Sequence, residues 1–236
     1  YSKATLGLEP KSKTFSTFQE LILGSDIFES TYEQASKLKS ESYLKLFDKT
    51  LLNKSMRSKL FEWLEISDNF AAIITNRPTS QTFGNLSTPE GELGAKLVGI
   101  ESIPMIGSGD IRWLAKEKLV GEGILLKPAP THALAAILAA LGNPIKKCLI
   151  DAYQYIYSDS ISNLRLGKYD TIFIFEDTSA GIISVSSLQE HLYEKNIGVN
   201  IRKIGISDSP DKTKVLKELG ADTFISVNNA LNSILN

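Results

Sequence analysis

From Asn69 to the end of the chain, short apolar runs of the kind that form strands alternate with segments of helical periodicity. The clearest run is Thr171–Phe175, Phe70–Ile74 is a second apolar run, and Asn200–Ile206 is another expected strand. Runs that are apolar throughout are typical of strands buried on both faces of a parallel sheet. Strands that alternate with helices form such sheets through right-handed crossovers. The pattern therefore predicts an α/β fold with a doubly wound parallel sheet.

Weaker signals complete the expected sheet and its helices. Ser102–Ile106 is a poorer strand candidate because it contains Pro104, which cannot donate to a strand ladder. Two further strands are expected at Ile124–Leu126 and Thr223–Ser226. Helical spacing of apolar residues predicts helices over Thr131–Leu141, Ile145–Ile156 and Asp211–Leu219.

The first 66 residues or so have a different character. Apolar residues recur there at helical spacing, as in Thr14–Leu23, and strand-like alternation is absent. We therefore expect two parts, a small helical cap over residues 1–66 and an α/β core over residues 67–236. Gln81–Glu92, which contains Gly, Ser, Thr and Pro, is the one stretch that resembles a linker.

Composition narrows the class of protein. The chain has 236 residues and a formal net charge of −1, so no electrostatic attraction to nucleic acid or to an anionic membrane is expected. No apolar run approaches the roughly 18 residues of a membrane span, and no signal peptide opens the chain. The single cysteine, Cys148, lies in an apolar run and is expected to be a buried, inert thiol. A cytoplasmic location is the default expectation.

Polar residues follow the expected strands at the points where ligands bind in open α/β sheets. Thr75-Asn76-Arg77 follows the first strand, Gly107-Ser108 the second, Lys127 the third, and Glu176-Asp177 the fourth. A hydroxyl and a cation can hold phosphoryl oxygens, and paired carboxylates suit a hard divalent cation such as Mg²⁺. The set predicts a phosphate-and-metal pocket.

Each of these residues also has a purely structural interpretation. Thr75 can simply end a strand, Lys127 can be a solvated lysine, and Asp177 or Thr178 can be the N-cap of the next helix. Their shared placement at strand ends favours a site. The two histidines, His132 and His191, lie in helical segments without a partner pattern, and only a structural role is expected for them.

Three of these segments resemble motifs of the haloacid dehalogenase (HAD) superfamily, and the resemblance covers about residues 69 to 230. Ile73–Pro78 looks like the second motif, a strand that ends in Thr or Ser. Lys127–Pro130 is similar to the third, a lysine within Lys-Pro-x-Pro. Phe175–Ile182 resembles the fourth, Phe-Glu-Asp-Ser/Thr-x-x-Gly-Ile. The helical segment ahead of them stands where such proteins insert a helical cap.

The resemblance implies a role for each matched residue. Thr75 and the backbone amide of Asn76 would bind phosphoryl oxygens, with Arg77 beside them on the substrate. Lys127 would neutralise charge on the nucleophile and on the phosphoryl group. The implied catalytic residues in this chain are thus Thr75 and Lys127, and the implied substrate is a small phosphorylated metabolite.

The acidic pair carries the implied metal chemistry. Asp177 would bind Mg²⁺, and Glu176 would be a second ligand, direct or through water. Dehalogenases of the same superfamily do not need a metal pair, so Glu176-Asp177 favours phosphoryl transfer, in which catalysis is mostly positioning and neutralisation of charge. The expected activity is Mg²⁺-dependent hydrolysis of a phosphate ester.

The first motif of the superfamily has no counterpart here. It is an apolar strand ending in Asp-x-Asp, whose first aspartate attacks phosphorus and whose second acts as general acid and base. The nearest stretch, Ala4–Glu9, contains no Asp and is broken by Gly7. The chain begins with Tyr1 rather than Met. We therefore expect the nucleophile on a strand a short distance upstream of Tyr1.

Two other functions stay open. One is a non-catalytic binding or regulatory domain that keeps the HAD fold without the nucleophile. The other is an unrelated nucleotide binder of the Rossmann type, which ranks lower because no Gly-x-Gly-x-x-Gly follows the first strand. The sequence does not identify the substrate, because the cap that would select it has no recognisable signature.

Overall fold

The computed structural model describes residues 13–82, 87–158, 166 and 171–235. Five strands lie in this part of the chain: β1 (Ile73–Ile74), β2 (Met105–Ile106), β3 (Thr171–Glu176), β4 (Asn200–Ile206) and β5 (Asp222–Phe224). Eleven α-helices are also found there: α1 (Lys13–Leu23), α2 (Ser25–Tyr32), α3 (Tyr43–Phe47), α4 (Lys54–Leu64), α5 (Glu90–Val98), α6 (Ser108–Glu117), α7 (Pro130–Ala140), α8 (Ile145–Tyr157), α9 (Ser179–Glu194), α10 (Pro210–Glu218) and α11 (Val227–Ile234).

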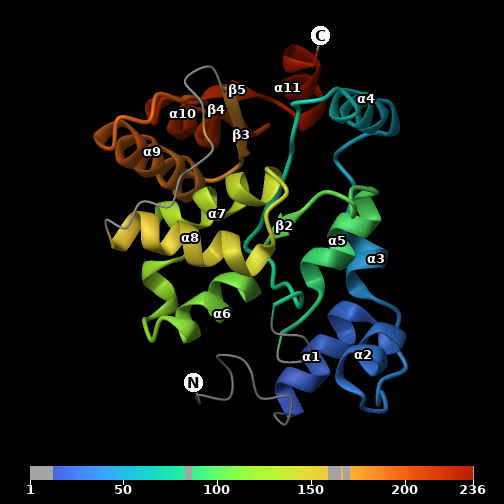
Figure 1. Cartoon of the computed structure of the whole chain (residues 1–236). Helices are drawn as coiled ribbons and strands as arrows, with labels where there is room; N and C mark the ends of the chain where they lie inside the picture. The colour runs from blue at the N-terminus through green and yellow to red at the C-terminus, as the bar shows by residue number, and fades with distance from the viewer. Residues whose placement is uncertain (1–12, 83–86, 159–165, 167–170, 236) are drawn as a thin grey trace.

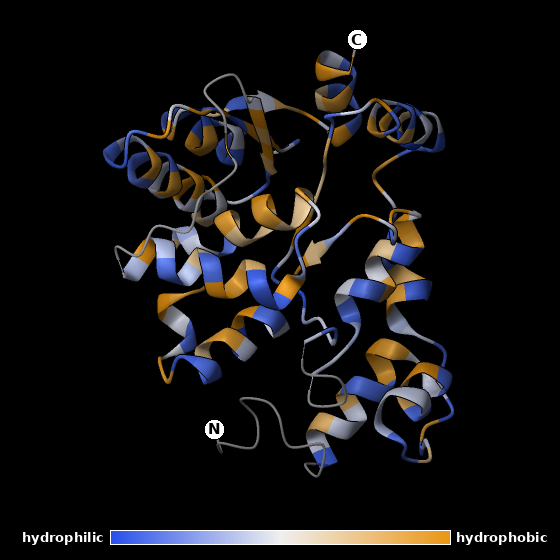
Figure 2. Ribbon diagram, in the orientation of Figure 1, coloured by the Kyte–Doolittle hydropathy of each residue, from blue (hydrophilic) through white to orange (hydrophobic). Residues whose placement is uncertain are grey.

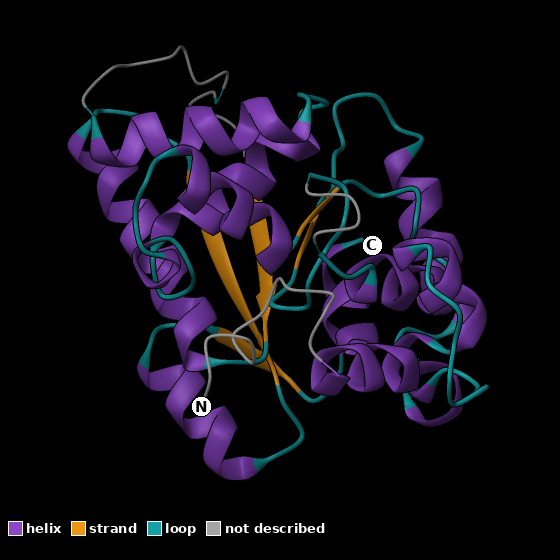
Figure 3. Cartoon of the chain, turned by 90° about the horizontal axis from the view of Figure 1, so that it is seen from below, coloured by secondary structure: helices purple, strands orange, loops and turns teal. Residues whose placement is uncertain are grey.

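The strands are parallel, as predicted, but they form two small sheets. β1 pairs with β2, and β3, β4 and β5 form a second sheet in that order. Seen from below, the strands lie between helices on either side (Figure 3), and Figure 1 shows β3, β4 and β5 near the top, between α10 and α11. The mixed α/β class is therefore confirmed. The expectation of one continuous sheet is wrong for the described residues, because no strand among them joins β1 to β3.

Two of the predicted strands are shorter than expected and one is absent. Only Ile73–Ile74 of the predicted Phe70–Ile74 run, and only Met105–Ile106 of Ser102–Ile106, pair as strands. The prediction of a strand at Ile124–Leu126 is wrong. The N–H groups of Leu125 and Leu126 both donate to the carbonyl of Glu122, at 2.9 and 3.1 Å, so the backbone forms a helical turn instead.

The second half of the chain follows the prediction closely. β3 and β4 pair over six residues, from Thr171 opposite Asn200 to Glu176 opposite Gly205. Helices α7, α8 and α10 lie where helical periodicity placed them. The predicted strand at Thr223–Ser226 appears as β5, displaced by one residue at its start.

Helix α7 is the centre of the hydrophobic core. Its residues Pro130 to Ala139 are all buried, and it contacts β1, β2, α8 and α9. Its sequence is rich in Ala and Leu, which favour helix, and Pro130 occupies the first turn, where the missing N–H costs nothing. The helix is apolar along most of its length, whereas the peripheral helices alternate polar and apolar residues (Figure 2). One helix therefore contacts both strands of the first sheet and also α9, the helix that packs against β3 and β4.

The N-terminal helices form a second, smaller cluster. Helical structure is confirmed for the described part of the expected cap, in α1 to α4, and residues 1–12 lie outside the described residues. Five buried residues make the cluster: Leu23, Phe28, Tyr32, Leu44 and Leu93. Leu93 belongs to α5, so α5 packs with the N-terminal helices although it follows β1 in the chain. The predicted boundary at residue 66 stays a prediction.

No helix that could span a membrane occurs among the described residues.

Candidate functional site

A cavity of about 330 Å³ opens between the carboxyl ends of β1 and β3. We call it the interstrand pocket, and its lining comes from both sheets and from the segment before α7: Ile74, Thr75, Asn76, Lys127, Phe175, Glu176, Asp177, Thr178, Ile206 and Val227. Five of the six predicted site residues therefore meet in one place, although they stand up to 102 positions apart (177 − 75). The sixth, Arg77, does not line the pocket.

Thr75 and Asn76 offer hydrogen-bond donors to the interstrand pocket. The Thr75 hydroxyl oxygen accepts the N–H of Arg77 at 3.1 Å, which leaves its own O–H free to donate elsewhere. The Thr75 N–H donates to the carbonyl of Ile106 at 3.0 Å and so ends the β1–β2 ladder. No described residue accepts the N–H of Asn76. A hydroxyl and a backbone amide are thus available for an anion, as the sequence predicted.

Arg77 turns away from the pocket. Its guanidinium forms an ion pair with Asp48, at 2.6 Å, and both side chains are more than a third exposed. Asp48 directly follows α3, so the pair connects the end of β1 to the N-terminal helices. The predicted contact between Arg77 and a substrate stays a prediction, and it requires the side chain to leave Asp48.

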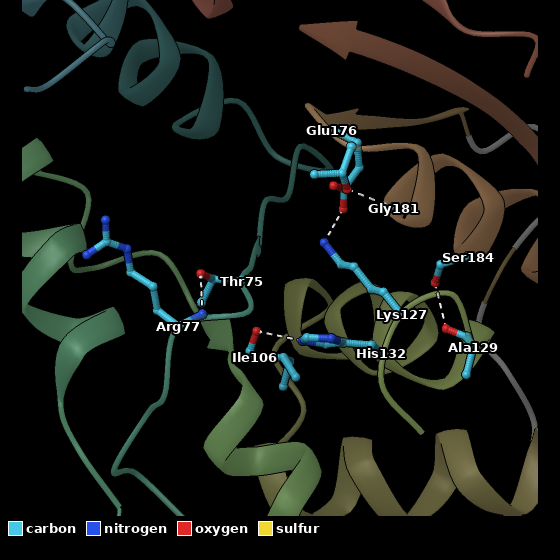
Figure 4. Close-up of polar contacts among 10 residues, drawn as sticks. Thr75, Arg77, Ile106, Lys127, Ala129, His132, Glu176, Gly181 and Ser184 are labelled. Atoms are coloured by element: carbon cyan, nitrogen blue, oxygen red, sulfur yellow. Dashed lines mark hydrogen bonds and ion pairs between the residues drawn. The ribbon is translucent and has the colours of Figure 1, made fainter. Parts of the chain in front are cut away.

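Lys127 and Glu176 form a buried ion pair (Figure 4). Their side chains are only 6% and 5% exposed, so neither charge is compensated by water. Burial raises the pKa of Glu176 above its ordinary value, and the positive charge of Lys127 works against this rise. A Cβ at Gly181 would lie 2.1 Å from the carboxylate of Glu176, so only glycine leaves room for it. The structure therefore fixes Lys127 at the pocket by pairing, not by solvation.

Asp177 is exposed and makes no hydrogen bond within the described part of the chain. The N-cap of α9 is Thr178, whose hydroxyl oxygen accepts the N–H of Gly181 at 3.1 Å. The structural interpretation of Asp177 as the helix cap is therefore wrong. Its carboxylate, which lines the interstrand pocket, is free to bind a ligand.

The acidic pair suits a divalent cation only in part. Asp177 supplies an unengaged carboxylate, but Glu176 is already paired with Lys127. Among the described residues, no three acidic, histidine or cysteine side chains gather into a metal-binding group. A Mg²⁺ ion bound to Asp177 would therefore need oxygen ligands from water, from a phosphoryl group or from a further segment, which is compatible with the octahedral, water-rich coordination it prefers.

The formal charges of the pocket residues favour the binding of a cation together with an anion. Counted formally, the lining residues include one basic side chain, Lys127, and two acidic ones, Glu176 and Asp177. A phosphate that enters alone would add negative charge to a site that is already net negative. A divalent cation beside Asp177 would reverse this balance, so binding of the two ligands is expected to be mutually dependent.

Two buried side chains lie near the site. The sequence predicts only a structural role for His132 and does not single out Ser184. His132 is fully buried, and its Nε2 lies 3.0 Å from the carbonyl oxygen of Ile106. Burial lowers the pKa of His132 to about 4, the bond to Ile106 opposes this, and the charge of Lys127 adds to it. Ser184 is also fully buried and donates to the carbonyl of Ala129 at 2.6 Å. Both acceptors are backbone atoms, which side-chain patterns do not reveal.

A third buried residue shapes the loop after Thr75. Asp110 is fully buried, and one oxygen of its carboxylate accepts three donors: the Thr79 hydroxyl at 2.6 Å, the Gln81 amide at 2.7 Å and the Gly107 N–H at 2.8 Å. The last bond caps α6, and the other two hold the segment after β1. The sequence signal for this role was an Asp at the third position of a helix that the prediction had missed.

The predicted burial of Cys148 is confirmed, and burial raises the pKa of its thiol to about 11. His191 bonds within its own helix, with Nδ1 2.9 Å from the carbonyl of Ser187. Neither residue lines the interstrand pocket.

Comparison of the chain with protein-family models, with curated proteins and with solved structures finds no match. The pocket geometry and the sequence motifs are thus the only grounds on which a function can be assigned.

Proposed function

We propose that this chain carries most of the active site of a Mg²⁺-dependent phosphohydrolase of the HAD type, acting on a small phosphorylated metabolite. The observation that carries the proposal is the convergence of Thr75, Lys127 and Asp177 on one pocket at the carboxyl ends of two parallel strands. Each of these side chains comes from a different one of the three segments that resemble motifs of the superfamily. The fold proposed on these grounds is a HAD-like α/β core with a small helical cap.

Each residue has a role that its surroundings permit. The free O–H of Thr75 and the N–H of Asn76 would donate to phosphoryl oxygens. Lys127, held at the pocket by Glu176, would neutralise negative charge that develops on the phosphoryl group. Asp177 would hold Mg²⁺, with Glu176 as a ligand through water while it is paired with Lys127. The ion, when bound, supplies positive charge opposite the transferred group.

The nucleophile is proposed to lie on one further strand, upstream of Tyr1. Two features of the fold support a strand between β1 and β3. The carboxyl ends of both strands line one pocket, but the strands belong to separate sheets. Both are also less buried than their apolar sequences lead one to expect, since Ile73, Ile74, Ile172 and Phe173 all keep partial exposure. A parallel strand placed there would bury these residues and would end beside Lys127.

The test is an assay of hydrolysis of p-nitrophenyl phosphate by the natural protein, with and without Mg²⁺. Turnover is expected only with Mg²⁺, and Asp177→Asn is expected to abolish it. Asp211→Asn is a matched control, because Asp211 is equally exposed and lies in the first turn of α10, away from the pocket lining. Turnover that is unchanged in Asp177→Asn would refute the metal role.

The same assay separates the proposal from the non-catalytic alternative. A binding or regulatory domain would be stabilised thermally by inorganic phosphate with Mg²⁺ and would show no turnover. A natural chain without an upstream strand that ends in an aspartate would point to that alternative.

A further inference from the structure

The two sheets that contribute the site are not connected by strand pairing in the described residues. Thr75 stands at the end of one sheet, and Glu176 and Asp177 stand at the end of the other. The segment from Lys127 to His132 lies between them and is part of neither. The distance between Thr75 and the acidic pair Glu176-Asp177 therefore depends on how this segment is bonded to the first sheet and to the second.

His132 attaches the segment to the first sheet. The carbonyl oxygen of Ile106 has two lone pairs. It accepts the Thr75 N–H at 3.0 Å, and the Nε2 of His132 lies at the same distance from it. With its pKa lowered by burial, the imidazole is neutral, and the Ile106 carbonyl requires the proton on Nε2. Because β1 has only two residues, this shared carbonyl is a large part of what holds Thr75 in place.

Ser184 attaches the same segment to the second sheet. Its hydroxyl donates to the carbonyl of Ala129 at 2.6 Å, and Ser184 lies on α9, which begins two residues after Asp177. Helix α9 packs against β3 and β4. Figure 4 shows the arrangement, with His132 directed at Ile106 on one side and Ser184 directed at Ala129 on the other.

We propose that His132 and Ser184 are positioning residues that hold Thr75, Lys127 and Glu176 in register across the two sheets. The expected effect on phosphate binding rests on the proposed function. The attachment of the segment by His132 and Ser184 does not depend on it. Neither side chain lines the pocket, so both would act through the backbone atoms they contact.

His132→Phe and Ser184→Ala remove one contact each. They are compared with one variant that retains a donor at position 132 and with two variants that leave both contacts in place. His132→Gln retains an N–H donor near the position of Nε2. His191→Phe and Ser233→Ala are matched controls, because those side chains bond within their own helices. Two quantities are measured in each variant of the chain: amide hydrogen exchange at Thr75 and Lys127 by NMR, and affinity for inorganic phosphate with Mg²⁺ by calorimetry.

His132→Phe is expected to accelerate exchange at Thr75 and to weaken phosphate binding about tenfold or more, the usual scale for a partner that orients a ligand-binding group. His132→Gln is expected to restore both. Ser184→Ala is expected to weaken binding while exchange at Thr75 stays unchanged. Unchanged phosphate affinity in both variants, with binding intact in the parent, would overturn the inference.

The proposed function can fail separately. If the parent chain binds no phosphate but exchange at Thr75 still responds to His132→Phe and recovers in His132→Gln, His132 positions Thr75 and the phosphate site is wrong. If exchange at Thr75 is the same in all variants, the positioning role is wrong, whatever the chain binds.

Discussion

The two sheets of this protein hold their functional residues by different means. In the sheet of β3, β4 and β5, six consecutive residue pairs align β3 with β4, and Glu176 is the last of them. In the sheet of β1 and β2, only two pairs exist. There, buried side chains add to the ladder: Asp110 bonds to Thr79 in the loop after Thr75, and His132 bonds to the carbonyl of Ile106 at the end of β2. One half of the site is therefore set by a regular backbone ladder and the other by buried polar side chains.

The comparison shows where single substitutions should matter. A ladder of backbone hydrogen bonds distributes its stability over many residues, so no one side chain is essential to it. A buried side chain that accepts several donors concentrates that stability, because its loss leaves each donor unpaired. Substitutions behind β1 and β2 should therefore cost more than substitutions around β4 and β5.

The largest effect is expected for Asp110→Ala. The Thr79 hydroxyl and the Gly107 N–H are buried and would lose their acceptor, at a cost of about 2 to 4 kcal/mol in the free energy of unfolding. Urea denaturation measures this value. Asp222→Ala is the matched control in the other sheet, because Asp222 is exposed and forms an ion pair with Arg202 alone among the described residues. This substitution should cost less than about 1 kcal/mol. Equal costs for the two variants would contradict the comparison.

The next effect concerns pH. Burial lowers the pKa of His132 to about 4 from an ordinary value of 6.5, so the unfolded chain takes up this proton before the folded chain does. The neutral imidazole contributes stability that is fully present above pH 6.5 and is lost as pH falls toward 4. Between pH 7 and 4.5 the loss should be about 2 kcal/mol.

Denaturation of the parent and of His132→Gln at both pH values isolates this contribution, since glutamine does not titrate. The difference in stability between the two proteins should shrink or reverse at the lower pH. A difference that is independent of pH would mean that folding does not change the pKa of His132.

A smaller cost is expected for Gly181→Ala, which tests the half of the site that the ladder holds. The added Cβ would lie 2.1 Å from the Glu176 carboxylate, so Glu176 must move away from Lys127. We expect about 1 to 2 kcal/mol in unfolding free energy and weaker binding of Mg²⁺ in calorimetric titration. Gly123→Ala is the control, because a Cβ there meets no atom within 4 Å. Unaltered Mg²⁺ binding would show that the position of Glu176 is unimportant.

The smallest effect is expected for Arg77→Ala. Its ion pair with Asp48 is half exposed and should contribute less than about 1 kcal/mol. If Arg77 does not contact substrate, affinity for inorganic phosphate with Mg²⁺ should also be unchanged. A marked loss of affinity in calorimetry would show that the guanidinium leaves Asp48 when phosphate binds, and would bring Arg77 into the site as the sequence predicted.

The sequence predicted the sheet of β3, β4 and β5 better than the sheet of β1 and β2. The reason is that regular strand pairing follows the local sequence pattern, whereas contacts of buried polar side chains do not. The apolar run Thr171–Phe175 pairs with Asn200–Ile206, a segment rich in isoleucine, so local pattern and observed strands agree. The Ile124–Leu126 run is too short to be distinguished from a helical turn by its residues alone, and backbone bonds to Glu122 decided the outcome. The strand ends at Thr75 and Glu176 were predicted because polar residues directly follow apolar runs.

Other parts of the site left no readable pattern in the sequence. The acceptor of His132 is a backbone carbonyl 26 positions away, and that of Ser184 is one 55 positions away. The choice between Asp177 and Thr178 as the cap of α9 depended on which side chain reaches Gly181. Such contacts arise only after the helices have packed.

The separation of the two sheets also has a consequence for how the molecule opens. Each sheet forms from its own continuous stretch of chain, residues 73–106 for one and residues 171–224 for the other. Stretches of this kind commonly unfold as separate cooperative units. Native-state exchange should therefore resolve two subglobal openings with different free energies. The interstrand pocket, built from the ends of both, would be lost with the weaker of the two while the rest of the protein is still folded.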